Sequence, residues 1–89
     1  MHLVTVSLGR EVPNAAMIDS DALTEALMAT TDVARVEHAR VVVHPLRVDI
    51  VLFLLAPSYS DAIYSARRIC QRALDSTLVT GWAVGFPTA

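Results

Sequence analysis

The chain has 89 residues, 54% of them hydrophobic and 18% charged, with a net charge of −2. This length predicts one domain spanning residues 1–89, and so apolar a composition excludes a disordered chain. All seven basic residues are arginines, and the slight acidic excess argues against nucleic-acid binding, which needs a basic surplus. Small domains have much surface to cover, so the excess of apolar side chains predicts an oligomer interface.

Cysteine content and hydropathy exclude further classes of protein. Cys70 is the only cysteine, which excludes a disulfide within the chain and a cysteine-based zinc site. The longest apolar run, residues 50–56, is far shorter than the ~20 residues that span a bilayer. Residues 1–6 show no basic segment followed by a long apolar stretch. We therefore expect a cytoplasmic protein with no membrane contact, no metal and no cofactor.

Residues 3–8 predict the first strand. Val4, Val6 and Leu8 fall on one face of this strand, and that face is entirely apolar. A helix is expected next, opening at the acidic cluster 19–21, because carboxylates suit the unpaired amides and positive dipole of a helix N-terminus. Apolar side chains then recur at helical spacing, and β-branched and short polar residues end the helix by about residue 32.

The centre of the chain, residues 36–56, predicts a β-hairpin. Strands over 36–44 and 47–56 flank a tight turn, in which Pro45 has the fixed φ and missing amide hydrogen that suit the second position. Counting outward from this turn divides the side chains between two faces. One face is apolar and is expected to hold the helices: Val41, Val43, Val48, Ile50 and Leu52. The other face is mixed: His38, Arg40, Asp49, Val51, Phe53 and Leu55.

The same count predicts the far end of the hairpin. It places Glu37 opposite Leu54 and Val36 opposite Leu55. A slip of one residue would exchange the faces of one strand, so the whole assignment depends on the turn.

The last third of the chain predicts a helix and a closing strand. Ser58, with Asp61 three residues later, resembles a capping box at a helix start. An apolar stripe follows that includes Cys70, which we expect to be a buried, inert thiol. Residues 78–86 alternate as a strand, and the pattern leaves open whether Trp82 faces the helices or the uncovered side of the sheet.

The predicted element order is therefore β-α-β-β-α-β, two βαβ halves joined at the central hairpin. This order resembles the ferredoxin-like, split βαβ architecture. The resemblance implies an α+β domain with a four-stranded antiparallel sheet in the order 4-1-3-2 and both helices on one face. The opposite face would then expose Val51, Phe53 and Leu55 to water.

No set of residues forms a catalytic or metal-binding signature. His38 and His44 lie six residues apart on one strand, about 20 Å, which is too far to share a metal ion. Arg40 and Asp49 lie diagonally across the mixed face, where they either form a cross-strand ion pair or fix a ligand or the register of a dimer. The candidate ligand or interface residues are His38, Arg40, Asp49, Val51, Phe53 and Leu55.

Three functions fit this sequence. The first, which we favour, is a non-catalytic homo-oligomeric interaction or regulatory module that dimerises through the open sheet face. A larger homo-oligomer, or binding to another protein, is the alternative form of this module. The second is a small-ligand-binding domain that uses the same face or a cleft between subunits. The third is a small enzyme of the dimeric α+β barrel type acting on an apolar substrate. A pocket of about 300 Å³ or more containing His38 or Arg40 would favour a ligand or substrate.

Overall fold

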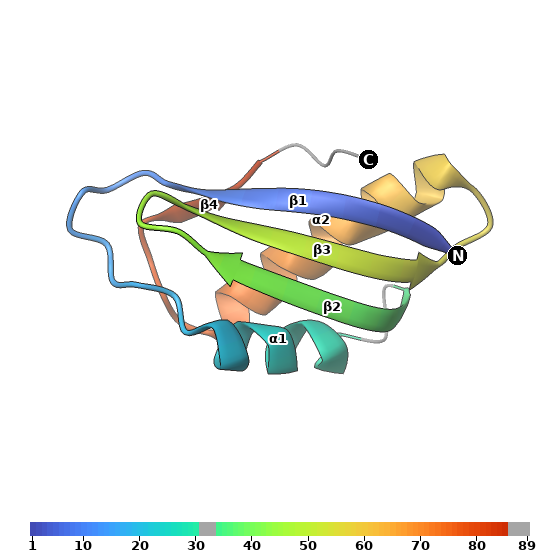
Figure 1. Cartoon of the computed structure of the whole chain (residues 1–89), viewed down its shortest axis with the longest axis horizontal. Helices are drawn as coiled ribbons and strands as arrows, with labels where there is room; N and C mark the ends of the chain where they lie inside the picture. Colours follow the sequence, from blue (N-terminus) through green and yellow to red (C-terminus); the bar gives the residue numbers. More distant parts are fainter. Residues whose placement is uncertain (31–33, 86–89) are drawn as a thin grey trace.

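The computed structural model describes residues 1–30 and 34–85, which form a small α+β domain with a four-stranded antiparallel sheet and two helices (Figure 1). The strand order is β2-β3-β1-β4, which reads 4-1-3-2 from the other edge. The six elements follow one another as β1 (His2–Arg10), α1 (Ser20–Ala29), β2 (Arg35–Val43), β3 (Arg47–Leu55), α2 (Tyr59–Ser76) and β4 (Trp82–Val84).

The two helices share one face of the sheet. Helix α1 packs against β2 and α2, and α2 packs across β1, β3 and β4. Alternate side chains of the two central strands are fully buried beneath them, as the apolar periodicity predicts: Val4, Val6, Leu8, Val48, Ile50, Leu52 and Leu54. Figure 1 looks onto the opposite face, where β1, β3 and β2 lie in front and α2 passes behind the sheet.

Both helices begin at the residues that their capping chemistry predicts. The Asp19 carboxylate accepts hydrogen bonds from two backbone amides of the first turn of α1. At α2, the Ser58 hydroxyl oxygen accepts a bond from the Asp61 amide and the hydroxyl donates to the Asp61 carboxylate. Helix α1 ends at Ala29, and its predicted end at 31–32 lies partly outside the described residues.

The predicted hairpin turn forms and fixes the register. The His44 amide donates to the Arg47 carbonyl at 2.8 Å, which closes the turn around Pro45. From there the pairing runs as counted, through Val43 opposite Val48, to a pair in which His38 lies opposite Phe53. The predicted helix-facing side is confirmed: Val48, Ile50 and Leu52 are fully buried, and Val41 and Val43 pack against the core.

Beyond His38 the predicted register is wrong. Val36 pairs with Leu54 and Arg35 with Leu55, so Glu37 is an extra residue in β2. This β-bulge moves Val36 to the core side, where it is buried, and leaves the Glu37 side chain paired with Arg35 at 2.9 Å. The bulge keeps a carboxylate out of the apolar interface with the helices.

The closing strand is much shorter than the predicted 78–86. Leu78 has φ +60° and Gly81 has φ +89°, so the chain turns twice in left-handed conformations before β4 begins. Phe86 lies outside the described residues. Trp82, whose orientation the sequence left open, faces the helices and is buried in the core.

Candidate functional site

The face of the sheet without helices is built from alternate residues of β1, β3 and β2. Each β3 side chain has one neighbour on either side, because β3 pairs with both other strands. The three rows of this open face are Leu3–Phe53–His38, Thr5–Val51–Arg40 and Ser7–Asp49–Val42, and Leu55 extends it at the end of β3.

One end of the open face is apolar. Leu3 is 46% exposed and Leu55 43% exposed, while Val51 and Phe53 are half-buried. The Phe53 ring lies 5.7 Å from the His38 ring, centroid to centroid, at a tilt of 55°. Large apolar side chains grouped in this way on a helix-free face are typical of a surface that a partner covers.

The other end is polar and is organised around Asp49. The Ser7 hydroxyl donates to one carboxylate oxygen of Asp49 at 2.9 Å. Arg47 Nε donates to the other oxygen at 3.2 Å, and His44 Nε2 lies 3.2 Å from that same oxygen. The open face therefore changes from apolar to polar along the strands.

The contacts of Asp49 hold it as an anion. Partial burial raises the pKa of Asp49, but the hydrogen bonds from Ser7 and Arg47 and the charges of Arg47 and His44 together lower this pKa below its usual value. A carboxylate with a lowered pKa is a weak proton acceptor. The Ser7 hydroxyl donates to the Asp49 carboxylate and not to His44. Ser7, His44 and Asp49 therefore lack the serine-to-histidine hydrogen bond of a hydrolytic triad.

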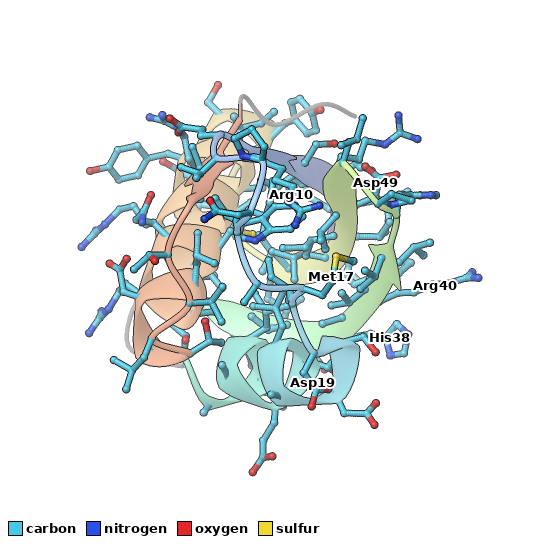
Figure 2. All side chains as sticks on the ribbon, turned by 90° about the vertical axis from the view of Figure 1, so that its left-hand side faces the viewer. Arg10, Met17, Asp19, His38, Arg40 and Asp49 are labelled. Carbon is cyan, nitrogen blue, oxygen red and sulfur yellow. The ribbon has the colours of Figure 1, made fainter. Side chains whose placement is uncertain are left out.

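The predicted ion pair between Arg40 and Asp49 is wrong. Val42 lies opposite Asp49 and Arg40 opposite Val51, as counted from the turn, but donors on β1, on β3 and in the turn occupy the carboxylate of Asp49. Arg40 is exposed, extends away from the sheet in Figure 2, and forms no ion pair with the described residues. Arg40 is thus a cation without an ion pair among the described residues, in the middle row of the open face on the edge strand β2.

Arg10 is the residue whose structural role the sequence did not reveal. Its guanidinium lies 5.9 Å from the centre of the Trp82 ring. One nitrogen donates to the Pro45 carbonyl at 3.2 Å and another to the Ala15 carbonyl, while Nε is buried without a partner among the described residues. Arg10 therefore joins the β1–α1 loop to the β2–β3 turn, and only the pairing of β1 with β4, which sets it opposite Trp82, could have predicted this contact.

Three hollows lie elsewhere on the domain. One of about 250 Å³ is at the 44–47 turn, and one of about 270 Å³ is between Ala26–Thr30 and the last turns of α2. The largest, about 480 Å³, lies between loop residues 12–16 and 78–81. His38 and Arg40 line none of these three hollows.

Cys70 is fully buried in the core, as predicted, and burial raises its pKa to about 12. Within residues 1–30 and 34–85, no three histidine, cysteine or acidic side chains gather to hold a metal ion. In the same ranges, neither helix is long and apolar enough to cross a membrane.

Comparison with known proteins identifies no relative: no family model, curated protein or solved structure matches this chain. The open face is therefore the feature from which a function is inferred.

Proposed function

We propose that this chain is a ferredoxin-like domain that works as a non-catalytic homodimeric module, regulatory or adaptor-like, in which two copies associate through their open faces. The strand order and the placement of both helices on one side support the fold assignment. The observation that carries the function is the apolar end of the open face, where Leu3, Val51, Phe53 and Leu55 adjoin.

The size of the open face supports a modest affinity. Three strands of nine residues cover about 26 by 14 Å at the usual rise and spacing. That footprint is of the order of 400 Å² before side-chain relief is added, below the ~800 Å² per partner of a standard interface. We therefore expect a dissociation constant in the micromolar rather than the nanomolar range.

Sedimentation equilibrium at micromolar concentrations tests this function. We expect the native chain to become dimeric as its concentration rises through the micromolar range and Phe53→Glu to stay monomeric, because the substitution places a carboxylate at the centre of the apolar end. Arg68→Glu is the matched control, since Arg68 is exposed on α2, away from the open face, and lies over the Tyr64 ring. A monomeric native chain, or equal effects of both substitutions, would contradict the proposal.

Native mass spectrometry of material from the original host separates the dimer from the ligand-binding alternative. We expect a mass of two chains with no retained small molecule. A ligand held by a single chain and lost in Arg40→Ala would instead favour a small-ligand-binding domain, and the homodimer would no longer explain the open face.

A further inference from the structure

We infer that the outer edge of β2 binds an extended peptide of another protein, which adds to the sheet as a further strand and rests on α1. This site is separate from the proposed homodimer, because it uses the edge of the sheet and not the open face. The peptide that fits alternates apolar side chains, which point towards α1, with acidic side chains, which point towards Arg40. Strand addition of this kind is a common mode of peptide recognition.

The ladder of β2, an edge strand, determines which of its backbone groups point outward. The His44 amide donates to the Arg47 carbonyl, so in residues 39–44 the even-numbered residues bond to β3 and the odd-numbered ones face away from it. The Arg10 amide, which donates to the Leu46 carbonyl, gives the same assignment from the other side of β3. The residues whose N–H and C=O groups point outward are Ala39, Val41 and Val43.

These outward groups lie in the regular part of β2. The bulge at Glu37 bounds this part at one end, and the turn at Pro45 bounds it at the other. Among residues 1–30 and 34–85, no backbone hydrogen bond from a turn or loop reaches the outward groups. Residues 39–43 include three consecutive valines, which favour extended structure. The edge therefore offers a short, regular template for one added strand.

Helix α1 forms a ledge beside this edge. It packs against β2, and Figure 1 shows it beyond β2, on the outer side of the sheet. A strand added to β2 would therefore pass over α1, and its side chains on that face would contact the helix instead of water. Val41 and Val43 are half-buried on the same face and pack against the core, so the added strand would extend an existing apolar contact.

The side of α1 that faces the added strand follows from the other contacts of the helix. Leu23 and Leu27 are buried in the core, and Ala26 lines the hollow against α2. At about 100° per residue, the side of the helix opposite Ala26 carries Thr24 and Met28. Met28 is 40% exposed, and its flexible thioether adapts to apolar partners of varied shape.

The charges on the two faces of the edge differ in sign. On the open face, Arg40 is exposed and has no ion pair among the described residues, so an acidic side chain on the added strand would be attracted to it. On the helix side, α1 contains exposed Asp21 and Glu25 and no basic residue, so acidic side chains are disfavoured there. Charge complementarity therefore selects a peptide that is acidic on one face and apolar on the other.

A second copy of this chain does not fit the same edge. Antiparallel pairing of β2 with β2 of a second copy would place the two-fold axis about 2.4 Å outside β2, half the usual strand spacing. Because α1 lies beyond β2, this axis would carry α1 of the second copy back beneath the first sheet, where the first copy's own helices lie. A peptide without a helix layer meets no such obstacle.

Amide hydrogen exchange with a synthetic peptide tests the site. The probe is acetyl-Val-Glu-Val-Glu-Val-amide, added to the full chain up to millimolar concentration. We expect exchange at the Val41 and Val43 amides to slow at least ten-fold, whereas the Val42 amide, already bonded to β3, exchanges slowly with or without the probe. Absence of this protection would overturn the inference. Protection that appears without the probe and grows with protein concentration would indicate a second copy and would equally overturn it.

Two substitutions separate edge pairing from binding elsewhere. Val41→Pro removes an outward N–H without breaking a bond to β3, so we expect loss of probe binding with far-ultraviolet circular dichroism unchanged. Arg40→Glu should weaken binding of the probe several-fold and favour acetyl-Val-Lys-Val-Lys-Val-amide instead. Arg68→Glu, on the exposed face of α2, is the matched control and should bind the probe as the native chain does. Unchanged affinity in Arg40→Glu and Val41→Pro would contradict the edge site.

The peptide site and the homodimer fail independently. Phe53→Glu, which is expected to disrupt the dimer, should bind the probe with native affinity, because Phe53 lies on β3 and not at the edge of the sheet. Loss of probe binding in Phe53→Glu would assign the peptide to the open face and overturn the edge site. A monomeric native chain that still binds the probe would overturn the homodimer alone.

Discussion

The guanidinium of Arg10 lies 5.9 Å from the centre of the Trp82 ring, and its two terminal nitrogens donate to backbone carbonyls of two different loops. Trp82 in turn donates from Nε1 to the Ala16 carbonyl at 2.9 Å. Figure 2 views this end of the domain, where Arg10 lies beneath the chain that leads to α1. The pair thus holds together β1, β4 and the loops beside them.

Replacing Arg10 tests how much this contact stabilises the fold. We expect Arg10→Ala to lower the free energy of unfolding by about 1–3 kcal/mol, because a half-buried cation–π contact and two hydrogen bonds are lost. Chemical denaturation measures the loss. Arg68→Ala is the control, since Arg68 lies 5.6 Å from the exposed Tyr64 ring and should cost under about 0.5 kcal/mol. Equal losses would show that Arg10 contributes only a surface contact.

Gly81 is required by its backbone and by its neighbour. Its φ is +89°, and a Cβ added there would lie 2.6 Å from Cβ of Ala15. We expect Gly81→Ala to lower the free energy of unfolding by about 1–3 kcal/mol, because the backbone is strained and the loop around Ala15 is displaced. In Gly9→Ala the added Cβ meets nothing within 4 Å, so thermal unfolding of that control should change little. A tolerated Gly81→Ala would mean that the loop moves freely away from β4.

Leu78 offers the opposite test, a substitution that should stabilise. It follows the C-cap of α2 with φ +60°, a conformation that costs a non-glycine residue about 1 kcal/mol, and its side chain is 87% exposed. Leu78→Gly should therefore raise the free energy of unfolding by about 0.5–1 kcal/mol, measured by urea denaturation. Leu78→Ala, which keeps the strain, should not. Destabilisation by Leu78→Gly would reveal a packing role for the leucine.

The lowered pKa of Asp49 predicts a pH dependence. Its folded pKa lies below the reference value of 3.8, so ionised Asp49 stabilises the fold above that value, and the contribution is lost as pH falls through the folded pKa. We expect Asp49→Asn to be less stable than the native chain at pH 7 by under about 1 kcal/mol, a partly exposed pair being worth little. The difference should shrink below about pH 4. A constant difference from pH 7 to pH 2 would exclude this electrostatic role.

Much of the sheet was predictable because local chemistry fixes it. Pro45 defines the turn, the turn defines the register, and strict alternation then assigns the buried side chains. The bulge was missed because no glycine marks it. The available signal was Glu37 itself, since a regular strand would have placed its carboxylate in the apolar interface opposite Leu54, and an extra residue removes that conflict.

The polar contacts were less predictable than the apolar ones. Which donor reaches Asp49 depends on Ser7, a residue far away in the sequence, and on the rotamers of Arg47 and His44 in the turn. Periodicity places a residue on a face but does not choose among several donors at similar distance. The grouping of Val51, Phe53 and Leu55 was predictable, whereas the contribution of Leu3 required the pairing of β1 with β3.

Because the carbonyls of Ala15 and Ala16 are held by Arg10 and Trp82, the connection from β1 to α1 is not a uniform tether. Its only long exposed arc is residues 11–14, and the anchored segment begins immediately afterwards. An epitope tag or a grafted peptide inserted between Pro13 and Asn14 would lengthen that arc at small entropic cost, and it would also open the turn that the Ala15 amide closes by donating to the Val12 carbonyl at 3.0 Å. The same insertion between Ala15 and Ala16 would separate the two carbonyls that Arg10 and Trp82 hold. We therefore expect an insertion there to destabilise the domain more than one between Pro13 and Asn14.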